Sequence, residues 1–176
     1  IGNGHIIPSG PLRENFLSIK RADCIVINGE KNMQFENKIK KINKNTKIFY
    51  SKYKIKNLDK FKNKKVVAFA GIGNPSNFFE LLKENNIDVK KTYSFPDHHI
   101  YSAKGDLAFI MADRFIFTDI ETNKSNERDV LLVTTEKDYS RINNYNKQFF
   151  DCVEVDLEIE NKSEFIRLIK SKIWKL

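Results

Sequence analysis

The chain has 176 residues, of which 40% are hydrophobic and 12% aromatic, a composition typical of a folded protein and not of a disordered tail. The net charge of +8 is uneven, because 13 lysines against two acids, Glu36 and Asp59, give residues 31–65 a balance of +11. The length allows one substantial core with a smaller attachment, and no apolar run approaches the roughly 20 residues that span a bilayer.

The N-terminal stretch opens on Ile1 in place of Met and runs directly into a Gly-Asn-Gly turn. Since no signal-peptide pattern is present, we expect this end to be a cut through a longer protein. Glycines and prolines up to residue 12 predict a shaped loop, and residues 13–20 a short helix. The apolar run 24–27 predicts a strand buried on both faces.

The lysine-rich segment that follows contains an expected helix near 33–42 and an alternating strand at 47–55. Its charge could steer the chain toward phosphates, an anionic membrane surface or nucleic acid. The segment 31–65 holds no arginine, the residue that binds phosphates bidentately, and its lysines alternate with Asn, Ile and Tyr. We therefore expect mainly a solvated face.

The rest of the chain alternates strands with helices, which predicts an α/β fold: a layered, mostly parallel sheet flanked by helices. Loops that leave the carboxyl ends of parallel strands gather ligands. Residues 71–75, 96–99 and 134–138 occupy that position, so we expect them at one edge of the sheet. The expected strands are 66–70, 89–95, 130–133 and 153–157, and the expected helices follow Asn74, cover 102–112, follow 134–138 and cover 165–174.

Two cysteines, Cys24 and Cys152, lie far apart in strand-like segments. Two buried core thiols explain them better than a disulfide or a metal site. A reducing, cytoplasmic compartment fits this usage.

The loop Gly71-Ile72-Gly73-Asn74-Pro75 is similar to a phosphate-cradling turn at a helix N-terminus, with Asn74 as cap and Pro75 in the first turn. It has neither the third glycine of a dinucleotide fingerprint nor the Gly-Lys-Ser/Thr of a Walker loop. Tight strand-to-helix packing would also explain both glycines without a ligand.

The second loop places Asp97, His98 and His99 after a strand. An imidazole can take or relay a proton at neutral pH, and a carboxylate can orient it. A zinc site lacks a third and fourth ligand at suitable spacing. We favour a functional role for His98 and a structural one for His99.

Two further pairs of residues have open interpretations. Glu14 can favour a helix dipole, or Arg13 and Glu14 can reach a phosphate or metal. Thr135 and Asp138 have the spacing of a capping box, and this structural role is sufficient to explain the residue pattern. Lys137 could add a point charge for a phosphate.

These segments, taken in order, resemble the tetraacyldisaccharide 4'-kinase family over nearly the whole chain. Each piece is common alone, and the set is specific. The matching stretches are Gly2-Asn3-Gly4 with residues 8–14, residues 68–75 with Phe78-Phe79, residues 95–99 with Tyr101, and residues 133–138.

The resemblance implies the C-terminal part of a P-loop-type kinase that moves the γ-phosphate of ATP onto the 4'-hydroxyl of tetraacyldisaccharide 1-phosphate. That reaction belongs to lipid A synthesis at the cytoplasmic face of the bacterial inner membrane, where the protein would be peripheral. It implies His98, with Asp97, as partner to a catalytic aspartate, orienting or relaying a proton. It implies Arg13 and Glu14 near Mg²⁺ and phosphate. The residues it implies for binding substrate or phosphate are Arg13, Gly71, Gly73, Asn74 and Lys137.

The chain also departs from that family. The Walker loop, the metal-binding Asp-Asp-Gly element, the aspartate base and the membrane-anchoring helix would all precede Ile1. We therefore expect the chain alone neither to bind ATP tightly nor to phosphorylate. The division by role is 1–29 for the end of the nucleotide-binding core, 30–56 for a lysine-rich inter-lobe linker and 57–176 for a C-terminal α/β lobe.

The partners expected are the lipid A disaccharide precursor, a membrane surface and the missing N-terminal part, with no nucleic acid. The alternative is a non-catalytic module that binds anions or nucleic acid through residues 31–65.

Overall fold

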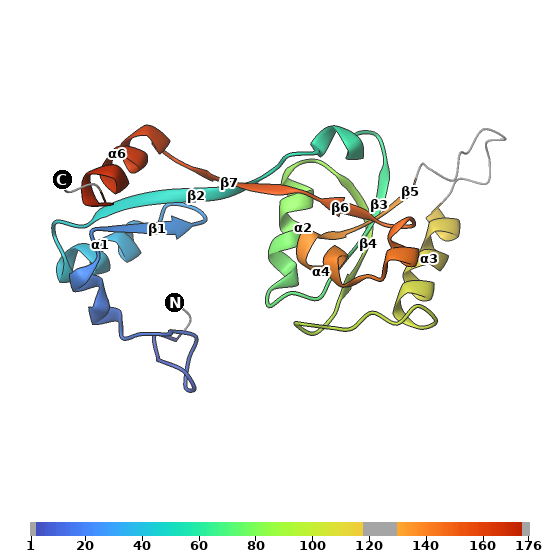
Figure 1. The fold of residues 1–176 in the computed structure, drawn as a ribbon, viewed down its shortest axis with the longest axis horizontal. Helices are drawn as coiled ribbons and strands as arrows, with labels where there is room; N and C mark the ends of the chain where they lie inside the picture. Colours follow the sequence, from blue (N-terminus) through green and yellow to red (C-terminus); the bar gives the residue numbers. More distant parts are fainter. Residues whose placement is uncertain (1–2, 118–129, 174–176) are drawn as a thin grey trace. The chain divides into compact units, whose positions relative to one another are not determined.

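The computed structural model describes residues 3–117 and 130–173. The chain forms two compact units: unit 1 is Ile1–Tyr53 with Leu157–Leu176, and unit 2 is Lys54–Asp156 (Figure 1). The division by role expected above (1–29, 30–56 and 57–176) concerns function, whereas these units are defined by compactness. It therefore stays a prediction.

Unit 2 is built on a parallel sheet whose strand order is β4-β3-β5-β6. β3 (Lys65–Ala70) pairs in parallel with β4 (Asp88–Ser94) and with β5 (Val130–Thr135), and β5 pairs in parallel with β6 (Asp151–Val153). The α/β fold with a parallel sheet flanked by helices is confirmed. The continuous apolar run of β3 suits its central place, because both of its faces are covered.

Alternate residues of β3 contribute to two cores on opposite faces of the sheet. Val66, Ala68 and Ala70 face α2 (Pro75–Glu84), whereas Val67 and Phe69 face α3 (Asp106–Phe117). These five residues have no exposed surface. Burying a side chain such as Phe69 stabilises the fold by about 1.5–3 kcal/mol. Figure 1 shows the two helices on opposite sides of the strands.

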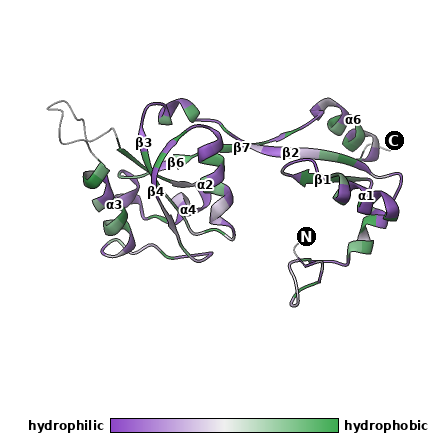
Figure 2. Cartoon of the chain, turned by 180° about the vertical axis from the view of Figure 1, so that it is seen from behind, coloured by the Kyte–Doolittle hydropathy of each residue, from purple (hydrophilic) through white to green (hydrophobic). Residues whose placement is uncertain are grey.

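The shorter elements of unit 2 lie around this sheet. The element α4 (Glu136–Arg141) starts directly after β5 and contacts β5 and β6. The 3-10 helix η2 (Leu58–Phe61) precedes β3, and α5 (Asn144–Lys147) precedes β6. Figure 2 shows hydrophobic residues along α3, where Phe109 and Ile116 are 72% and 69% exposed.

Unit 1 contains most of a second sheet of order β1-β2-β7. β1 (Cys24–Asn28) pairs in parallel with β2 (Lys47–Ile55), and β7 (Val155–Ile159) lies on the other side of β2. The helices of this unit are η1 (Phe16–Arg21), α1 (Met33–Ile42) and α6 (Lys162–Ile173). The expected helix 33–42 and strand 47–55 are confirmed.

Several expected boundaries are wrong for physical reasons. The expected strand 153–157 is two strands, β6 and β7, which belong to different sheets and are separated at Glu154. The expected helix 102–112 starts at Asp106, and the Ser102 hydroxyl accepts hydrogen bonds from the amides of Gly105 and Asp106. Trp174, the expected end of the last helix, lies outside the described residues.

Burial of β1 and of the cysteines is also lower than expected. β1 is an edge strand with one neighbour, and its Val26 is 40% exposed, so the strand is not buried on both faces. Cys24 and Cys152 are free thiols of intermediate exposure and not fully buried core residues. Burial still raises the pKa of Cys152 to about 11.

Candidate functional site

Three loops meet at the carboxyl edge of the parallel sheet in unit 2, as the sequence predicts. Residues 71–75 follow β3, residues 96–99 follow β4, and residues 134–138 run from β5 into α4. The loops are joined by hydrogen bonds of Gly71 to Asp138 and of Lys137 to Asp97. Because adjacent parallel strands end at the same edge, these bonds span a long sequence distance but a short spatial one.

A wholly buried carboxylate anchors this edge. Asp138 accepts a hydrogen bond from the Gly71 amide (3.0 Å) and one from the Thr135 hydroxyl (2.8 Å) on the same oxygen. Its other oxygen lies 3.3 Å from Arg141 Nη1. The Thr135 hydroxyl also accepts from the Asp138 amide at 3.1 Å, so the capping role expected for Thr135 is confirmed. Burying a carboxylate is costly unless it is paired and hydrogen-bonded in this way.

The two glycines of the first loop differ in what surrounds them. A Cβ on Gly71 would lie 2.8 Å from the Tyr101 hydroxyl and 3.1 Å from the Pro96 carbonyl oxygen, so close packing requires glycine there. A Cβ on Gly73 would meet only Asp97 Oδ2, at the ordinary distance of 3.7 Å. Packing therefore explains Gly71 but not Gly73.

The start of α2 is open and uncapped. Asn74 occupies the N-cap position, but its side chain accepts no capping hydrogen bond and instead donates to Asn77 Oδ1 at 3.0 Å. The expected capping bond is therefore absent, although Pro75 starts the helix as expected. The first amides of a helix have no partner within it, so an uncapped start can accept an anion.

His98 projects from the second loop with a positive φ of 63° and a side chain that is 73% exposed. Its backbone amide donates to Asp97 Oδ1 (3.0 Å) and to the Gly71 carbonyl (3.2 Å). Its ring nitrogen Nε2 lies 3.6 Å from Asp97 Oδ2, and Nδ1 lies 2.9 Å from Arg141 Nη2. The loop is therefore fixed through its backbone while the imidazole faces solvent.

Asp97 and Lys137 form an ion pair of 2.9 Å between these loops. The Lys137 ammonium, followed by the neighbouring His98, holds the pKa of Asp97 below its ordinary value. The Asp97 carboxylate is therefore charged at neutral pH. A phosphate that approached Lys137 would have to share this ammonium with Asp97.

His99 has the structural environment expected for it. Its ring stacks on Phe95 with centroids 4.6 Å apart, and Nε2 lies 3.1 Å from Asp106 Oδ2. The Ser102 amide, and then the His99 ring, lower the pKa of Asp106. Nearby, burial is the main cause that raises the pKa of Tyr101, with a further contribution from the Asp138 carboxylate.

Arg13 and Glu14 belong to unit 1, in the segment before η1, and are exposed. Glu14 forms an ion pair with Arg21. A hydrogen bond from Ser18, and then the Arg21 guanidinium, lower the pKa of Glu14. Across residues 3–117 and 130–173, no group of three or more His, Cys, Asp or Glu side chains could hold a metal ion. Glu14 can therefore offer one carboxylate to a metal and no more.

Many lysines of residues 31–65 are paired with acids. Their partners come largely from later segments: Lys31 with Glu160 and Lys47 with Glu164 in unit 1, and Lys60 with Asp151 in unit 2. The local balance of +11 is thus partly neutralised when the chain folds. The alternative of a binding module for anions or nucleic acid loses most of its motivation.

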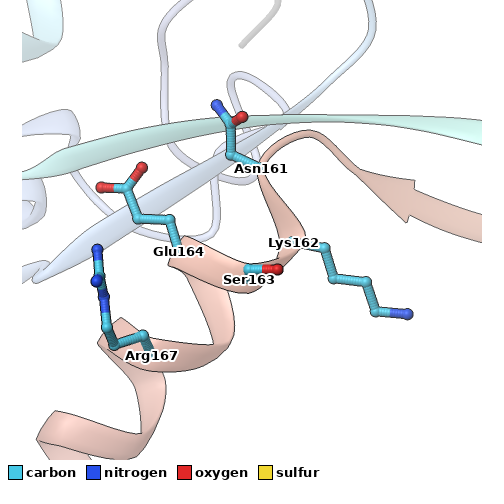
Figure 3. Close-up of a pocket in the computed structure, with 5 residues that line it drawn as sticks. All are labelled: Asn161, Lys162, Ser163, Glu164 and Arg167. Carbon is cyan, nitrogen blue, oxygen red and sulfur yellow. The ribbon is translucent and has the colours of Figure 1, made fainter.

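A shallow pocket of about 510 Å³ lies at the start of α6 in unit 1. Figure 3 shows that its lining comes from a single stretch of chain, in which Glu164 also pairs with Lys47. None of the motifs above contributes to it. The lining residues are Asn161, Lys162, Ser163, Glu164 and Arg167.

Sequence reasoning missed Arg141. It follows Asp138 by three residues, the spacing that places side chains on one face of a helix, so the acid–base pair could have been read from the sequence. Its contact with His98, 43 residues away, could not.

The family model LpxK, described as tetraacyldisaccharide-1-P 4'-kinase, matches residues 1–174. The tetraacyldisaccharide 4'-kinase of Pelagibacter ubique is 37% identical over 97% of this chain and 52% of its own length. That of Rickettsia typhi is 33% identical over 99% of this chain and 48% of its own length.

Among solved structures, the chain is similar to LpxK from Aquifex aeolicus in complex with ATP, with a TM-score of 0.57 and 24% identity. The match covers 96% of this chain and 48% of the other, and it supports the fold. The chain thus spans about half the length of the curated relatives it matches. In the described ranges, none of the helices combines the length and apolarity needed to cross a bilayer.

Proposed function

Because the chain belongs to the tetraacyldisaccharide-1-P 4'-kinase family, we propose that it is the C-terminal part of an enzyme that phosphorylates tetraacyldisaccharide 1-phosphate. The reaction transfers the γ-phosphate of ATP to the 4'-hydroxyl of the disaccharide. The family match over residues 1–174 carries this proposal. The meeting of the three loop motifs at one sheet edge supports it, since ligands bind at such edges.

In this proposal His98 assists the transfer of the proton from the acceptor hydroxyl. Phosphoryl transfer needs positioning and charge neutralisation more than covalent help. A side chain that assists the transfer of the hydroxyl proton, by orienting its partner or by relaying the proton, contributes about 10²–10⁴-fold. The exposed imidazole on a fixed backbone suits that task, with Asp97 beside it. In this proposal the catalytic aspartate that His98 assists would lie outside this chain.

The phosphate side would involve Gly73, Asn74 and Lys137. The open start of α2 presents amides to an anion, and Gly73 leaves room for close approach of a phosphate. Lys137 adds a positive charge that Asp97 holds in place. Gly71 contributes by packing, so its role is to shape the loop.

ATP and Mg²⁺ are the cofactors that the family implies. The chain contains no Gly-Lys-Ser/Thr sequence, so the ATP phosphates would be held mainly outside it. Arg13 and Glu14 would contribute a guanidinium and one carboxylate, and Mg²⁺ commonly binds one or two carboxylates together with substrate phosphates. When bound, the ion neutralises charge on the phosphates. Glu14 would first have to exchange its Arg21 partner.

The lipid substrate suggests a peripheral position at the cytoplasmic face of the inner membrane. Exposed lysines of residues 31–65, such as Lys38, Lys41 and Lys44, could face anionic lipid headgroups. This placement rests on the nature of the substrate.

The test uses the intact protein that carries this chain, γ-labelled ATP and tetraacyldisaccharide 1-phosphate. We expect label at the 4' position, located by phosphorus NMR of the product, and none with an acceptor that lacks the 4'-hydroxyl. The 176-residue chain alone should transfer no phosphate. Label at another position, or robust transfer by the 176-residue chain unaided, would contradict the proposal.

A further inference from the structure

Arg141 is the last residue of α4, and its guanidinium contacts all three loops of the site. Nη1 lies 3.2 Å from the Gly71 carbonyl and 3.3 Å from Asp138 Oδ1, and Nη2 lies 2.9 Å from His98 Nδ1. Its side chain is 22% exposed, against 73% for His98. A largely buried cation thus holds an exposed imidazole.

The contact determines which nitrogen of His98 carries the proton. A guanidinium has only donors, so a hydrogen bond between Arg141 and His98 requires Nδ1 to accept. A neutral imidazole that accepts at Nδ1 has its proton on Nε2. A doubly protonated ring would set an N–H of His98 against an N–H of Arg141 and lose the bond.

The same contact fixes where Nε2 points. With a mostly exposed ring, His98 has little packing to restrict its rotation. Nε2 is 3.6 Å from Asp97 Oδ2, longer than a hydrogen bond, so its proton is free for another acceptor. Without Arg141, the ring would sample several orientations and both neutral tautomers.

We propose that Arg141 is a positioning residue that holds His98 as the neutral tautomer protonated at Nε2, with this N–H directed to an acceptor in the reacting complex. His98 then orients its partner by donating a hydrogen bond and does not relay a proton through an imidazolium. The catalytic meaning rests on the proposed kinase function, whereas the tautomer does not.

The tautomer is measured directly in the intact protein labelled with ¹⁵N-histidine, with His98 assigned by comparison with His98→Gln. At a pH of about 7.5, where an ordinary histidine is mostly neutral, we expect an unprotonated Nδ1 and a protonated Nε2. A protonated Nδ1 in the wild-type protein would overturn the proposal, whether or not the protein phosphorylates lipid.

Variants test the consequence for catalysis. Arg141→Met should give a mixture of tautomers and lower kcat by about 10- to 100-fold, the order expected from misplacing a catalytic group, with little change in KM. Arg141→Lys retains a charge for Asp138 and one donor for Nδ1. It should therefore restore part of the wild-type tautomer population and part of kcat. Lys83→Met, which removes an exposed cation from α2, is the control and should match wild type.

The outcomes separate the two proposals. Because Arg141→Met removes the cation that pairs with the buried Asp138, the melting temperature of this variant is measured first. If the variant does not fold, Arg141→Lys and the wild-type tautomer decide. An unchanged kcat in a folded variant whose tautomer is altered would refute the positioning role and leave the kinase function standing. The expected tautomer in a protein that transfers no phosphate would refute only the kinase function.

Discussion

Replacing Gly71 by alanine should destabilise unit 2, whereas the same change at Gly73 should not. The added Cβ at Gly71 would lie 2.8 Å from the Tyr101 hydroxyl, 3.1 Å from the Pro96 carbonyl oxygen and 3.2 Å from His99 Cβ. Tyr101 is only 8% exposed and cannot swing away, and the Pro96 oxygen belongs to the backbone. The loop after β4 would have to move.

The magnitude follows from two opposing terms. Overpacking of this kind costs about 1–3 kcal/mol, and the lower entropy of the unfolded alanine chain returns about 0.4–1 kcal/mol. We expect a net loss of about 1–2 kcal/mol at Gly71, or roughly 5–10 °C in melting temperature for a domain of this size class. At Gly73, where the nearest atom is 3.7 Å away, stability should be unchanged or slightly higher.

Circular dichroism monitors the urea unfolding of both variants, and the turnover of the intact protein is measured for each of them. If Gly73 allows close approach of a phosphate, Gly73→Ala should lower turnover without lowering stability. A Gly71→Ala protein as stable as wild type would refute the packing argument. A destabilised Gly73→Ala protein would show that the two glycines are not different in kind.

Three further predictions concern charged and nucleophilic groups of unit 2. Asp138→Asn, which presents an amide to donors such as the Gly71 N–H, should lower the free energy of unfolding by about 2–4 kcal/mol in urea titrations, and a loss below about 0.5 kcal/mol would contradict the buried anchor. Asp97 has a lowered pKa, so its ion pair with Lys137 should stabilise the fold above the ordinary carboxyl pKa and lose this effect as pH falls through the lower folded value. The stability difference between wild type and Lys137→Met should therefore vanish at low pH, and a difference independent of pH would contradict the pairing. In a protein whose only cysteine is Cys152, alkylation by iodoacetamide should speed up about tenfold per pH unit from 7 to 10, and a plateau near pH 8.5 would contradict the raised pKa of about 11.

The sheet of unit 2 was predictable because its signal is local. The run from Val66 to Ala70 is apolar at every position, and it is followed directly by a turn and a helix start. Such a strand has one stable location, the middle of a parallel sheet covered on both faces. The approach of the three polar loops to one edge follows from that topology.

Other features depend on contacts that sequence separation conceals. The break at Glu154 is hidden by an alternating pattern that continues through it, so one expected strand became two in different sheets. The neutralisation of the lysine-rich segment could not be predicted, because its acidic partners are far away in the sequence. Glu164, for example, pairs with Lys47 across 117 residues. Asn74 sits at a cap position but bonds elsewhere.

The site was predictable in part for the same reason. Motif spacing placed His98 and Asp97 at the sheet edge, and the structure pairs Asp97 with Lys137. The link from His98 to Arg141 needed coordinates, because it joins two loops through a side chain outside every recognised motif.

The measurement that tests the account most directly is the turnover of the intact protein with His98 replaced by alanine. The side chain is 73% exposed, so the melting temperature should be nearly that of wild type. Turnover with ATP and tetraacyldisaccharide 1-phosphate should fall by about 10²–10⁴-fold, while Lys83→Met should retain the wild-type rate. A folded His98→Ala protein with unchanged turnover would remove His98 from the mechanism and contradict the account.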